Sequence, residues 1–489
     1  MIGSMPGPEL EALLPILLPA LGAIWILGLV AWRREGDLSW PAANAVLFLG
    51  LSAVSAVLLL GRGARREILG GALVVDTQAL AFHLVFLVVA GLTVLSSAGH
   101  LRGLGIRQGE FFALVLLAVS GMSIMASSEN LLTIFLGLEI LSIALYVLAG
   151  FTRDQDFAVE GALKYFLLGA FSTGFVLYGM ALFYGVTGRI DLRGIAAYLS
   201  AGRGGPIDPL VPAGAALLLI GMAFKVAAVP FHFWAPDVYQ GALAPVSGFM
   251  AAGTKAAAFA TLLRILQVAL GQPPVSDQWI AVVSVLALLS MIAGNLIALA
   301  QQNIKRMLAY SSIANAGYLL VAVAAGGRIR GSGGVVLFYL AAYAFMTVGA
   351  FATAALVGRA APGDGGDSVT DFAGLARRRP TLAAAMAVFM LSLTGIPPTG
   401  GFMGKFYVFR SAVDAGMYGL AVTGVLASVV GAFYYLRVVV QMYLRDPAPG
   451  GAALAPSPSE NLAILLAAAG TLYLGLFPGR LFDLAKLLI

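Results

Sequence analysis

Apolar runs long enough to cross a membrane recur along almost the whole chain. A helix needs roughly 20 mainly apolar residues to cross the hydrocarbon core of a bilayer, and about fourteen such runs can be placed. They lie near residues 10–31, 42–60, 76–96, 109–127, 130–150, 160–185, 209–230, 245–270, 278–299, 305–325, 334–358, 380–410, 417–443 and 460–478. The pattern predicts a single all-α, polytopic membrane domain over residues 1–489, with no soluble domain between the spans.

Proline interrupts the seventh and the twelfth of these runs. Pro230 follows a glycine-containing stretch, and Pro397 and Pro398 stand inside the twelfth run. Proline removes a backbone hydrogen bond, and irregular backbone at membrane depth is tolerated only beside protein or a water-filled cavity. Interrupted helices five spans apart predict two inverted five-helix repeats, near 109–270 and 278–443, as transporters use. The alternative is an ordinary proline kink at each site.

The composition excludes several classes of function. Hydrophobic residues make up 60% of the chain and charged residues only 11%, so we expect the lipid bilayer to surround it. The net charge of +6 is spread over short loops without a basic run, which argues against a nucleic-acid partner. With no cysteine and only three histidines, we expect no metal site and no cofactor in this chain.

The basic residues of the loops predict an orientation. With an even number of spans, both termini lie on one side of the membrane. About 13 lysines and arginines fall on the side away from the termini and about 11 on the side with them. The positive-inside rule therefore favours a cell-membrane protein with both termini on the outer side.

Lysine and arginine are distributed differently along the chain. Only six of the 29 basic residues are lysines, and four of these fall within predicted spans: Lys164, Lys225, Lys255 and Lys405. Each charge inside a span costs roughly 2.5–3.5 kcal/mol on insertion scales, so four of them need a functional explanation. A desolvated lysine can release its proton near neutral pH, whereas arginine stays charged. The distribution indicates proton transfer.

Glu139 is the only acid deep within an otherwise apolar predicted span. A carboxylate in that position needs a cation, and Lys164 on the next span is the expected partner. Such a pair could switch proton binding, because approach of Glu139 stabilises the charged lysine and separation favours proton release. The alternative is a static buried ion pair, which would leave the other three lysines unexplained.

Histidine has the charge change closest to physiological pH, and His232 lies just past the Pro230 break. We expect it to carry a proton between lysines, although a hydrogen-bonded core histidine is the alternative. His83 has no polar neighbour in sequence and is interpreted as structural, and His100 is expected in a loop. Asp237 is expected to cap the helix that restarts after the break.

Three long motifs resemble a known family. They are KVAAVPFHFWAPDVYQG at 225–241, NIKRMLAYSSI at 303–313 followed by Gly317 and Tyr318, and GIPPTGGFMGKFY at 395–407. They are similar to the proton-pumping membrane subunits of respiratory complex I, which are related to large subunits of multisubunit sodium/proton antiporters. The resemblance extends from about residue 76 to 445 and departs from the usual pattern at Leu243, where a proline is common.

The resemblance implies a role for each charged position. Glu139 and Lys164 match the family's switch pair, and Lys225 matches its central proton-binding lysine. His232 and Lys255 match the connecting axis, and Lys405 matches the lysine on the exit side.

The resemblance also implies a function and partners. It implies a proton-translocating subunit of an NADH–quinone oxidoreductase, with neighbouring membrane subunits as partners. NADH, FMN, iron–sulfur clusters and quinone would be bound by other chains. The alternatives are a subunit of a multisubunit cation/proton antiporter, a ferredoxin- or hydrogenase-linked relative, and a passive scaffold.

Overall fold

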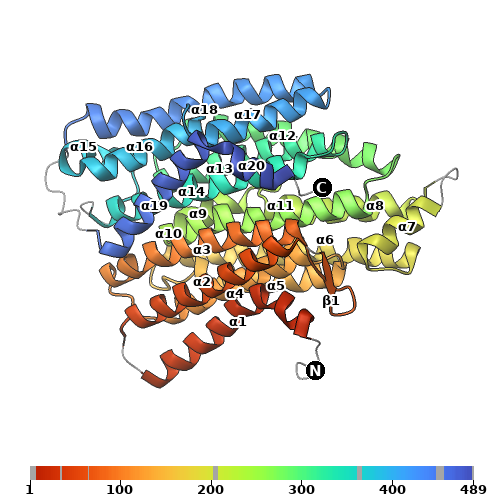
Figure 1. Cartoon of the computed structure of the whole chain (residues 1–489). Coiled ribbons are helices and arrows are strands. Elements are labelled where there is room, and N and C mark those ends of the chain that lie inside the picture. Colours follow the sequence, from red (N-terminus) through yellow and green to blue (C-terminus); the bar gives the residue numbers. More distant parts are fainter. Residues whose placement is uncertain are drawn as a thin grey trace.

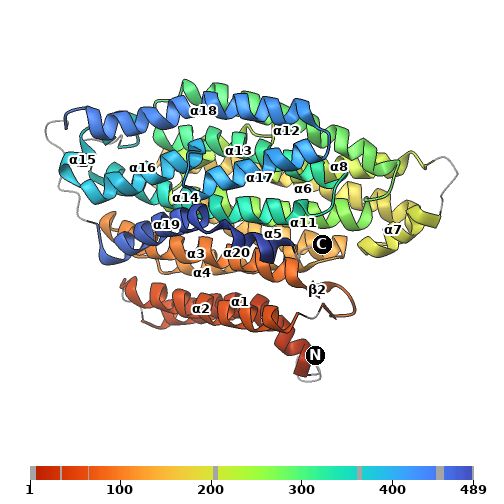
Figure 2. The same cartoon turned by 45° about the horizontal axis from the view of Figure 1, so that its top comes forward.

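The computed structural model describes residues 7–33, 36–63, 65–201, 207–360, 366–447 and 456–486. Within those ranges, twelve helical segments are long and apolar enough to cross a membrane, and they run side by side in one bundle (Figures 1 and 2). They are α1 (Gly7–Arg33), α2 (Ser39–Arg62), α3 (Thr77–Gly103), α4 (Glu110–Ser127), α5 (Leu131–Ala149), α6 (Asp156–Thr187), the segment Ala244–Ala269, α12 (Val275–Leu299), α13 (Ile304–Gly326), α14 (Ser332–Ala360), α18 (Tyr418–Leu444) and α19 (Pro458–Leu476).

Two further crossings are made by interrupted helices. The apolar helices α8 (Leu210–Lys225) and α16 (Pro380–Thr394) are too short to span alone. Each is continued after a few non-helical residues, by α9 (Trp234–Gly241) and α17 (Gly400–Asp414). The all-α membrane fold and both predicted breaks are therefore confirmed.

The backbone at each break departs from ordinary helix geometry. Gly395 ends α16 with a φ of +92°, in a region that glycine enters without a steric penalty. After α8, Ala227 has a φ of +56°, which costs a residue with a Cβ about 1–2 kcal/mol. The chain keeps this conformation because the residues around it are tightly packed, and backbone strain of this kind is typical of functional sites.

Several elements were not predicted from the apolar pattern. A short antiparallel hairpin, β1 (Arg66–Ile68) and β2 (Leu73–Val75), precedes α3. The polar stretches contain α7 (Leu192–Ala201), the 3₁₀ turn η4 (Val369–Phe372) and α15 (Leu375–Arg378), and α20 (Pro478–Lys486) follows α19. The segment Ala244–Ala269 is divided into α10 (Ala244–Phe249), the π-helical η2 (Met250–Thr254), α11 (Lys255–Arg264) and the π-helical η3 (Ile265–Ala269).

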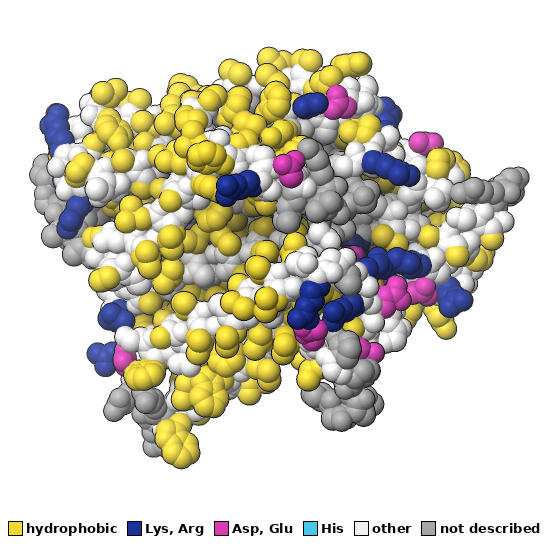
Figure 3. Space-filling model, in the orientation of Figure 1, with side chains coloured by type: hydrophobic (Ala, Val, Ile, Leu, Met, Phe, Trp, Pro, Cys, Tyr) yellow, Lys and Arg dark blue, Asp and Glu magenta, His cyan; other side chains and the backbone are white. Residues whose placement is uncertain are grey.

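The outer surface of the bundle is largely hydrophobic, as Figure 3 shows for one face. On α6, Phe171 is 70% exposed, and on α18, Val429 is 67% exposed. A soluble protein rarely leaves such extended apolar surface in water. These side chains are suited to contact with lipid or with other membrane chains.

The same loop contact occurs twice. Asn130 caps α5 and forms an isolated bridge with Asp191, while Asn303 caps α13 and forms one with Ser368. Each bridge is flanked by two backbone hydrogen bonds, one on each side of the pair. Their lengths are 2.8 and 2.8 Å in the first case and 2.7 and 2.9 Å in the second. The two contacts lie at opposite ends of the bundle, near α7 and α15 in Figure 1. This supports our proposal that residues 109–270 and 278–443 are inverted repeats.

A glycine contact repeats in the same way. A Cβ on Gly121 of α4 would lie 2.6 Å from the backbone nitrogen of Leu141, and one on Gly294 of α12 would lie 2.6 Å from that of Ala314. Leu141 and Ala314 are equally far from their capping asparagines (130 to 141 and 303 to 314). Each helix pair therefore needs glycine for the same close approach.

Candidate functional site

Three of the predicted lysines are almost completely buried. Lys225 is 2% exposed, Lys255 is 1% exposed and Lys405 is 5% exposed. They lie on three different elements, α8, α11 and α17, and none forms an ion pair within hydrogen-bonding distance in the described part of the chain. A buried ammonium group without a close counter-ion depends on hydrogen bonds and dipoles for its stability.

Lys225 is the last residue of α8. Its Nζ donates a 2.7 Å hydrogen bond to Ser142 Oγ on α5. The ammonium group also lies 5.9 Å from the ring centroid of Tyr146 and 5.5 Å from that of Tyr165, within the range of cation–π attraction. The lysine therefore has one hydrogen-bond acceptor and two aromatic faces around it.

Glu139 lies on the same face of α5 as Ser142 and Tyr146, at helical spacings of three and seven residues. It interacts electrostatically with Lys225, and its buried Oε1 has no hydrogen-bond partner among the described residues. The predicted pairing of Glu139 with Lys164 is therefore wrong in this structure. Helix packing places the Glu139 side chain on the side of α5 that faces α8. The order of the helices along the chain does not determine which neighbouring helix this side faces.

Lys164 belongs to a different ionic cluster. It forms ion pairs with Glu160 at 2.6 Å and with Asp237 at 2.8 Å, and its side chain is 42% exposed rather than deeply buried. Asp237 also receives a 2.6 Å hydrogen bond from Arg306 on α13. The N-cap position of α9 is taken by Phe233, so Asp237 is not the expected cap. Asp237 instead connects α6, α9 and α13.

His232 lies within the break between α8 and α9 and is 7% exposed. Its buried Nδ1 has no hydrogen-bond partner among the described residues, and its ring centroid lies 6.5 Å from that of Tyr310 on α13. The structure thus puts a histidine with a free nitrogen beside α13, without a direct hydrogen bond to a lysine. Its predicted role as a carrier remains a prediction.

Lys255 begins α11, directly after the π-helical turn η2. Its Nζ donates to Ser312 Oγ on α13 at 2.5 Å and also to the Ser312 carbonyl oxygen. A π-helical turn contains an extra residue and often marks a functional position in a helix. Here it immediately precedes the buried ammonium-bearing residue.

Lys405 extends from α17 back to the end of α16. Its Nζ donates to the carbonyl oxygens of Leu393 at 2.8 Å and Thr394 at 3.0 Å, and to Ser428 Oγ at 2.7 Å. It lies 4.9 Å from the ring centroid of Tyr318. The carboxyl end of a helix carries partial negative charge, so α16 stabilises the ammonium group.

Polar side chains that the sequence analysis did not single out lie next to Lys405. Asn295 of α12 donates to Tyr318 Oη at 3.1 Å and accepts from Tyr434 Oη at 3.0 Å. This carboxamide fixes which way both hydroxyl groups point. Tyr318, which also contacts Lys405, keeps its own proton available to donate.

A second set of hydrogen bonds starts beside Ser312. The neighbouring Ser311 shares a hydrogen bond with Tyr435 Oη, and Asn315 accepts a 2.5 Å hydrogen bond from Tyr339 Oη. Asn315 also donates to the Ser311 carbonyl oxygen at 2.8 Å. The adjacent rings of Tyr434 and Tyr435 have centroids 4.3 Å apart and bring the two networks together. Asparagine and tyrosine inside apolar runs were the available signal for these residues.

An ionic cluster around Glu129, which lies between α4 and α5, fixes the hairpin end of the bundle. Glu129 accepts from Arg65 at 2.8 Å, Arg193 at 3.0 Å and Arg264 at 3.2 Å, and Arg264 also pairs with Asp76. Burial alone would raise the pKa of Glu129, but hydrogen bonding and charge from these arginines, chiefly Arg65, hold its pKa below the ordinary value. The cluster joins the hairpin, α7 and α11.

The other two histidines lie in α3. His83 is hydrogen-bonded to Ser52 Oγ at 2.8 Å and to Ser123 Oγ at 2.7 Å, which links α2, α3 and α4 and agrees with a structural role. His100 is in the last turn of α3 and is buried, so its predicted place in a loop is wrong. Among the described residues, no group of three or more His, Cys, Asp or Glu is arranged to hold a metal ion.

Comparison with known proteins places the chain in a family. Residues 128–431 match the family described as NADH:quinone oxidoreductase/Mrp antiporter, TM. A Trichlorobacter lovleyi protein named NADH-quinone oxidoreductase subunit N is 45% identical over 98% of this chain and 96% of its own length. A protein of Solibacter usitatus named subunit N 1 is 45% identical over 98% and 97%.

Solved structures agree with this relationship. A chain of respiratory complex I from Thermus thermophilus with bound Aureothin superposes with a TM-score of 0.80 at 37% identity, covering 96% of this chain and 99% of the other. A chain of an Mrp complex from a Dietzia species reaches 0.85 at 22% identity over 98% and 96%, which shows the shared fold alone. The chain therefore belongs to the NADH:quinone oxidoreductase/Mrp antiporter family of membrane proteins, together with the relatives named subunit N.

Proposed function

We propose that this chain carries protons across the membrane as the antiporter-like subunit N of an NADH–quinone oxidoreductase. The observation that carries the proposal is the set of buried lysines, Lys225, Lys255 and Lys405, on three elements of one bundle. None of the three is neutralised by a hydrogen-bonded carboxylate, so each can change protonation state without breaking a tight ion pair. Sequence identity to relatives named subunit N supports the assignment.

The proposed route begins at Lys225 and ends at Lys405. A proton held near Lys225 and Glu139 passes the break, with His232 as carrier, and reaches Lys255. Hydroxyl groups can accept one proton while donating another, so Ser312 and the tyrosines on α14 and α18 can continue the path. Asparagine cannot pass on a proton in this way and serves to orient the hydroxyl groups. Water between these groups would complete the chain.

The pair Glu139 and Lys225 is the proposed switch. Approach of the carboxylate stabilises the protonated lysine, and withdrawal releases its proton. Moving one charge against 100 mV takes about 2.3 kcal/mol, so the switch must change the proton affinity of the lysine by at least that amount. Lys164, held by Asp237, is proposed to transmit movement of α6 to α9 and α13.

Other chains would supply the redox chemistry and the neighbouring surfaces. We assign NADH, FMN, iron–sulfur clusters and quinone to partner subunits. For the clusters the reason is chemical, because a chain without cysteine has no thiolate to ligate one. Adjacent membrane subunits and lipid would cover the apolar outer surface. We propose that both termini lie on the outer side, from the count of basic loop residues.

A cation/proton antiporter without a redox partner is the second candidate. The TM-score of 0.85 to the Mrp chain shows only that the fold is compatible with it, and the sequence identity of 22% is far lower than that to the subunit N relatives. The native complex should show flavin and iron–sulfur absorbance if the first candidate is right. Sodium-dependent proton exchange by a complex without these centres would favour the second.

Replacement of the switch residues tests the proposed route. Lys225→Ala and Glu139→Ala should suppress NADH-driven proton uptake by inverted membrane vesicles, measured with a quenched acridine dye. Electron transfer to an artificial acceptor provides the measure of assembled complex, and Glu160→Gln, at a largely exposed acid, is the matched control. Full proton translocation in both alanine variants would disprove this route.

A further inference from the structure

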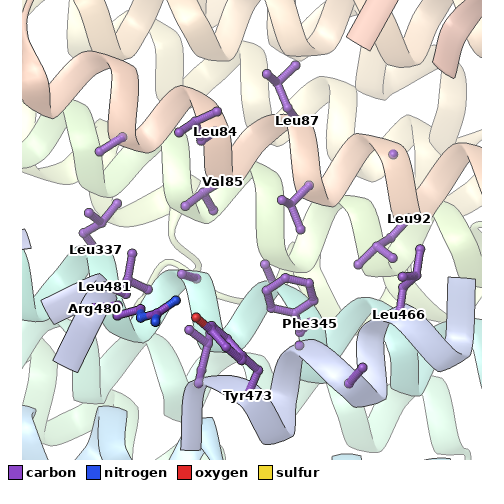
Figure 4. Close-up of a pocket in the computed structure, with 18 of the residues that line it drawn as sticks. Leu84, Val85, Leu87, Leu92, Leu337, Phe345, Leu466, Tyr473, Arg480 and Leu481 are labelled. Carbon is purple, nitrogen blue, oxygen red and sulfur yellow. The ribbon is translucent and has the colours of Figure 1, made fainter. Parts of the chain in front are cut away.

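A large apolar groove lies on the outside of the bundle, far along the chain from the break residues. It has a volume of about 850 Å³ and is formed by α3, α14, α19 and α20. Leu84, Val85 and Leu92 of α3 face Phe345 of α14 and Leu466 of α19 across it (Figure 4). None of the proposed relay residues lines this groove.

The groove is longer than one leaflet of a bilayer and shorter than a complete crossing. Along α3 its lining extends from Ala81 to Leu95, which corresponds to about 21 Å at 1.5 Å per residue. Half of the hydrocarbon core is about 15 Å thick, and a complete crossing needs about 30 Å. The groove is therefore too short for a transmembrane helix of another chain and long enough for one acyl chain.

The polar groups of the groove are gathered at one end. In Figure 4, the hydroxyl group of Tyr473 and the guanidinium group of Arg480 lie close to Leu337, while Leu92 and Leu466 are at the other end. Leu337 is near the start of α14, so this polar end faces the membrane surface at which α3 and α14 begin. Arg480 is exposed and forms no ion pair in the part of the chain that the structure describes.

We propose that this groove binds one phospholipid of that leaflet, with its phosphate on Arg480 and one acyl chain between α3, α14 and α19. Apolar lining alone gives little preference, because lipid tails are as apolar as the side chains they would meet. The guanidinium group provides selectivity, since its planar set of donors matches a phosphate group. The groove has a cation at the membrane surface and an apolar lining toward the midplane. This arrangement is complementary to a phospholipid, which has its phosphate at the surface and its acyl chains toward the midplane.

Two substitutions test the two ends separately. Arg480→Gln removes the phosphate contact at an exposed position. Gly91→Leu fills the groove, because a Cβ on Gly91 meets no atom within 4 Å and the added side chain projects into open space. The matched controls are Arg330→Gln, at another exposed arginine, and Gly50→Leu, at an exposed glycine of α2 with equally open surroundings.

The experiment uses the complete complex reconstituted in vesicles of phosphatidylethanolamine and phosphatidylglycerol. Part of the phosphatidylglycerol carries a photoreactive diazirine in its acyl chain, and the labelled peptides are identified by mass spectrometry. We expect labelling to concentrate on α3, α14 and α19, to fall roughly fivefold or more in each test variant, and to stay unchanged in the controls. If Gly91→Leu fails to assemble, Arg480→Gln alone decides the outcome.

Two results would overturn the proposal. Labelling spread evenly over all lipid-facing helices and insensitive to Arg480→Gln would mean that only ordinary annular lipid contacts this face. Cross-links from groove residues to another polypeptide in the complex would mean that a protein chain fills the groove.

Discussion

Lys225 and Lys405 lie on opposite sides of their helix breaks. Lys225 is the last residue of α8 and precedes its break, whereas Lys405 follows its break and lies within α17. The two lysines therefore do not occupy corresponding places in the two predicted repeats. The two charges nevertheless share an environment, because Lys405 reaches back to the final carbonyl groups of α16, and both ammonium-bearing side chains are thus associated with the carboxyl end of a first half-helix.

A permanently charged residue in place of Lys405 should support assembly of the complex but not proton pumping. Lys405→Arg keeps a cation near the carbonyl groups of α16, so we expect the complex to assemble. NADH-driven pumping should fall roughly tenfold or more, because arginine does not release its proton. Lys405→Met leaves the Leu393 and Thr394 carbonyl groups without this donor and should cost about 1–3 kcal/mol of stability. Dye quenching and thermal unfolding measure the two effects. Normal pumping by the arginine variant would show that Lys405 never needs to deprotonate.

The tyrosine network gives a prediction at a single hydroxyl group. Tyr435→Phe removes the partner of Ser311 Oγ and should lower proton translocation, with a loss of stability of about 0.5–1.5 kcal/mol. Tyr443→Phe, at a half-exposed tyrosine of the same helix, should change neither quantity. Equal pumping by the two variants would remove Tyr435 from the route.

Asp237 should matter more than Glu160, although both pair with Lys164. Asp237 joins Lys164 to Arg306 and thereby connects three helices, whereas Glu160 is largely exposed and lies on the same helix as Lys164. We expect Asp237→Asn to reduce pumping severalfold with a stability change below about 1 kcal/mol, since the pairs are partly exposed. Glu160→Gln should pump normally. Proton uptake by vesicles carrying each variant tests the order, and a larger effect at Glu160 would contradict it.

Acid should loosen the hairpin end of the bundle. The pKa of Glu129 is lowered in the folded chain, so its contribution to stability is complete above the unfolded value and is lost as the pH falls through the lower, folded value. The protection of amides in β1, β2 and α7, measured as the ratio of the intrinsic to the observed exchange rate at each pH, should therefore be high near about pH 7 and fall below about pH 4.

A variant of Glu129 provides the control for this pH dependence. Glu129→Gln should exchange faster across the whole range, with a local loss of roughly 3 kcal/mol, because Arg264 is left as a buried charge with one partner fewer. The same acid-dependent step in the glutamine variant would assign the transition to another group.

The two repeated glycine contacts should be equally intolerant. Gly121→Ala and Gly294→Ala each place a methyl group 2.6 Å from backbone of the facing helix, so one helix must move. We expect each to cost about 1–3 kcal/mol and to lower the amount of assembled complex. Gly174→Ala, where nothing lies within 4 Å, is the control. Normal thermal stability of either contact variant would show that the helices can separate without penalty.

The sequence predicted what depends on local pattern and missed what depends on neighbours. Apolar runs located all fourteen crossings seen in the described residues, and prolines located both breaks. The pairing of Glu139 failed, because which side of α5 faces α8 is set by helix packing and not by chain order. Asp237 was assigned a local cap, while its partner Lys164 lies 73 positions away.

Short elements and long-range hydrogen bonds were not predicted from the sequence, for related reasons. Three-residue strands carry too little pattern to detect, and the burial of Leu192 and Ile195 in α7 becomes clear only against the bundle. The hydrogen bond between Ser311 and Tyr435 joins residues 124 positions apart, so neither residue indicates the other in sequence.

The bridge of Asn130 and its upside-down counterpart at Asn303 have a consequence for vectorial transport. If one half of the bundle is the other half turned over, the backbone is nearly the same from both sides of the membrane and specifies no direction. Direction must then come from positions where the halves differ. Nine residues after each asparagine (130 to 139 and 303 to 312) one half has Glu139 and the other has Ser312. One half thus has a carboxylate that can change the charge of a lysine, where the other half has a hydroxyl group that can only form a hydrogen bond with one. We infer that this difference gives a direction to a path that is otherwise the same from both sides.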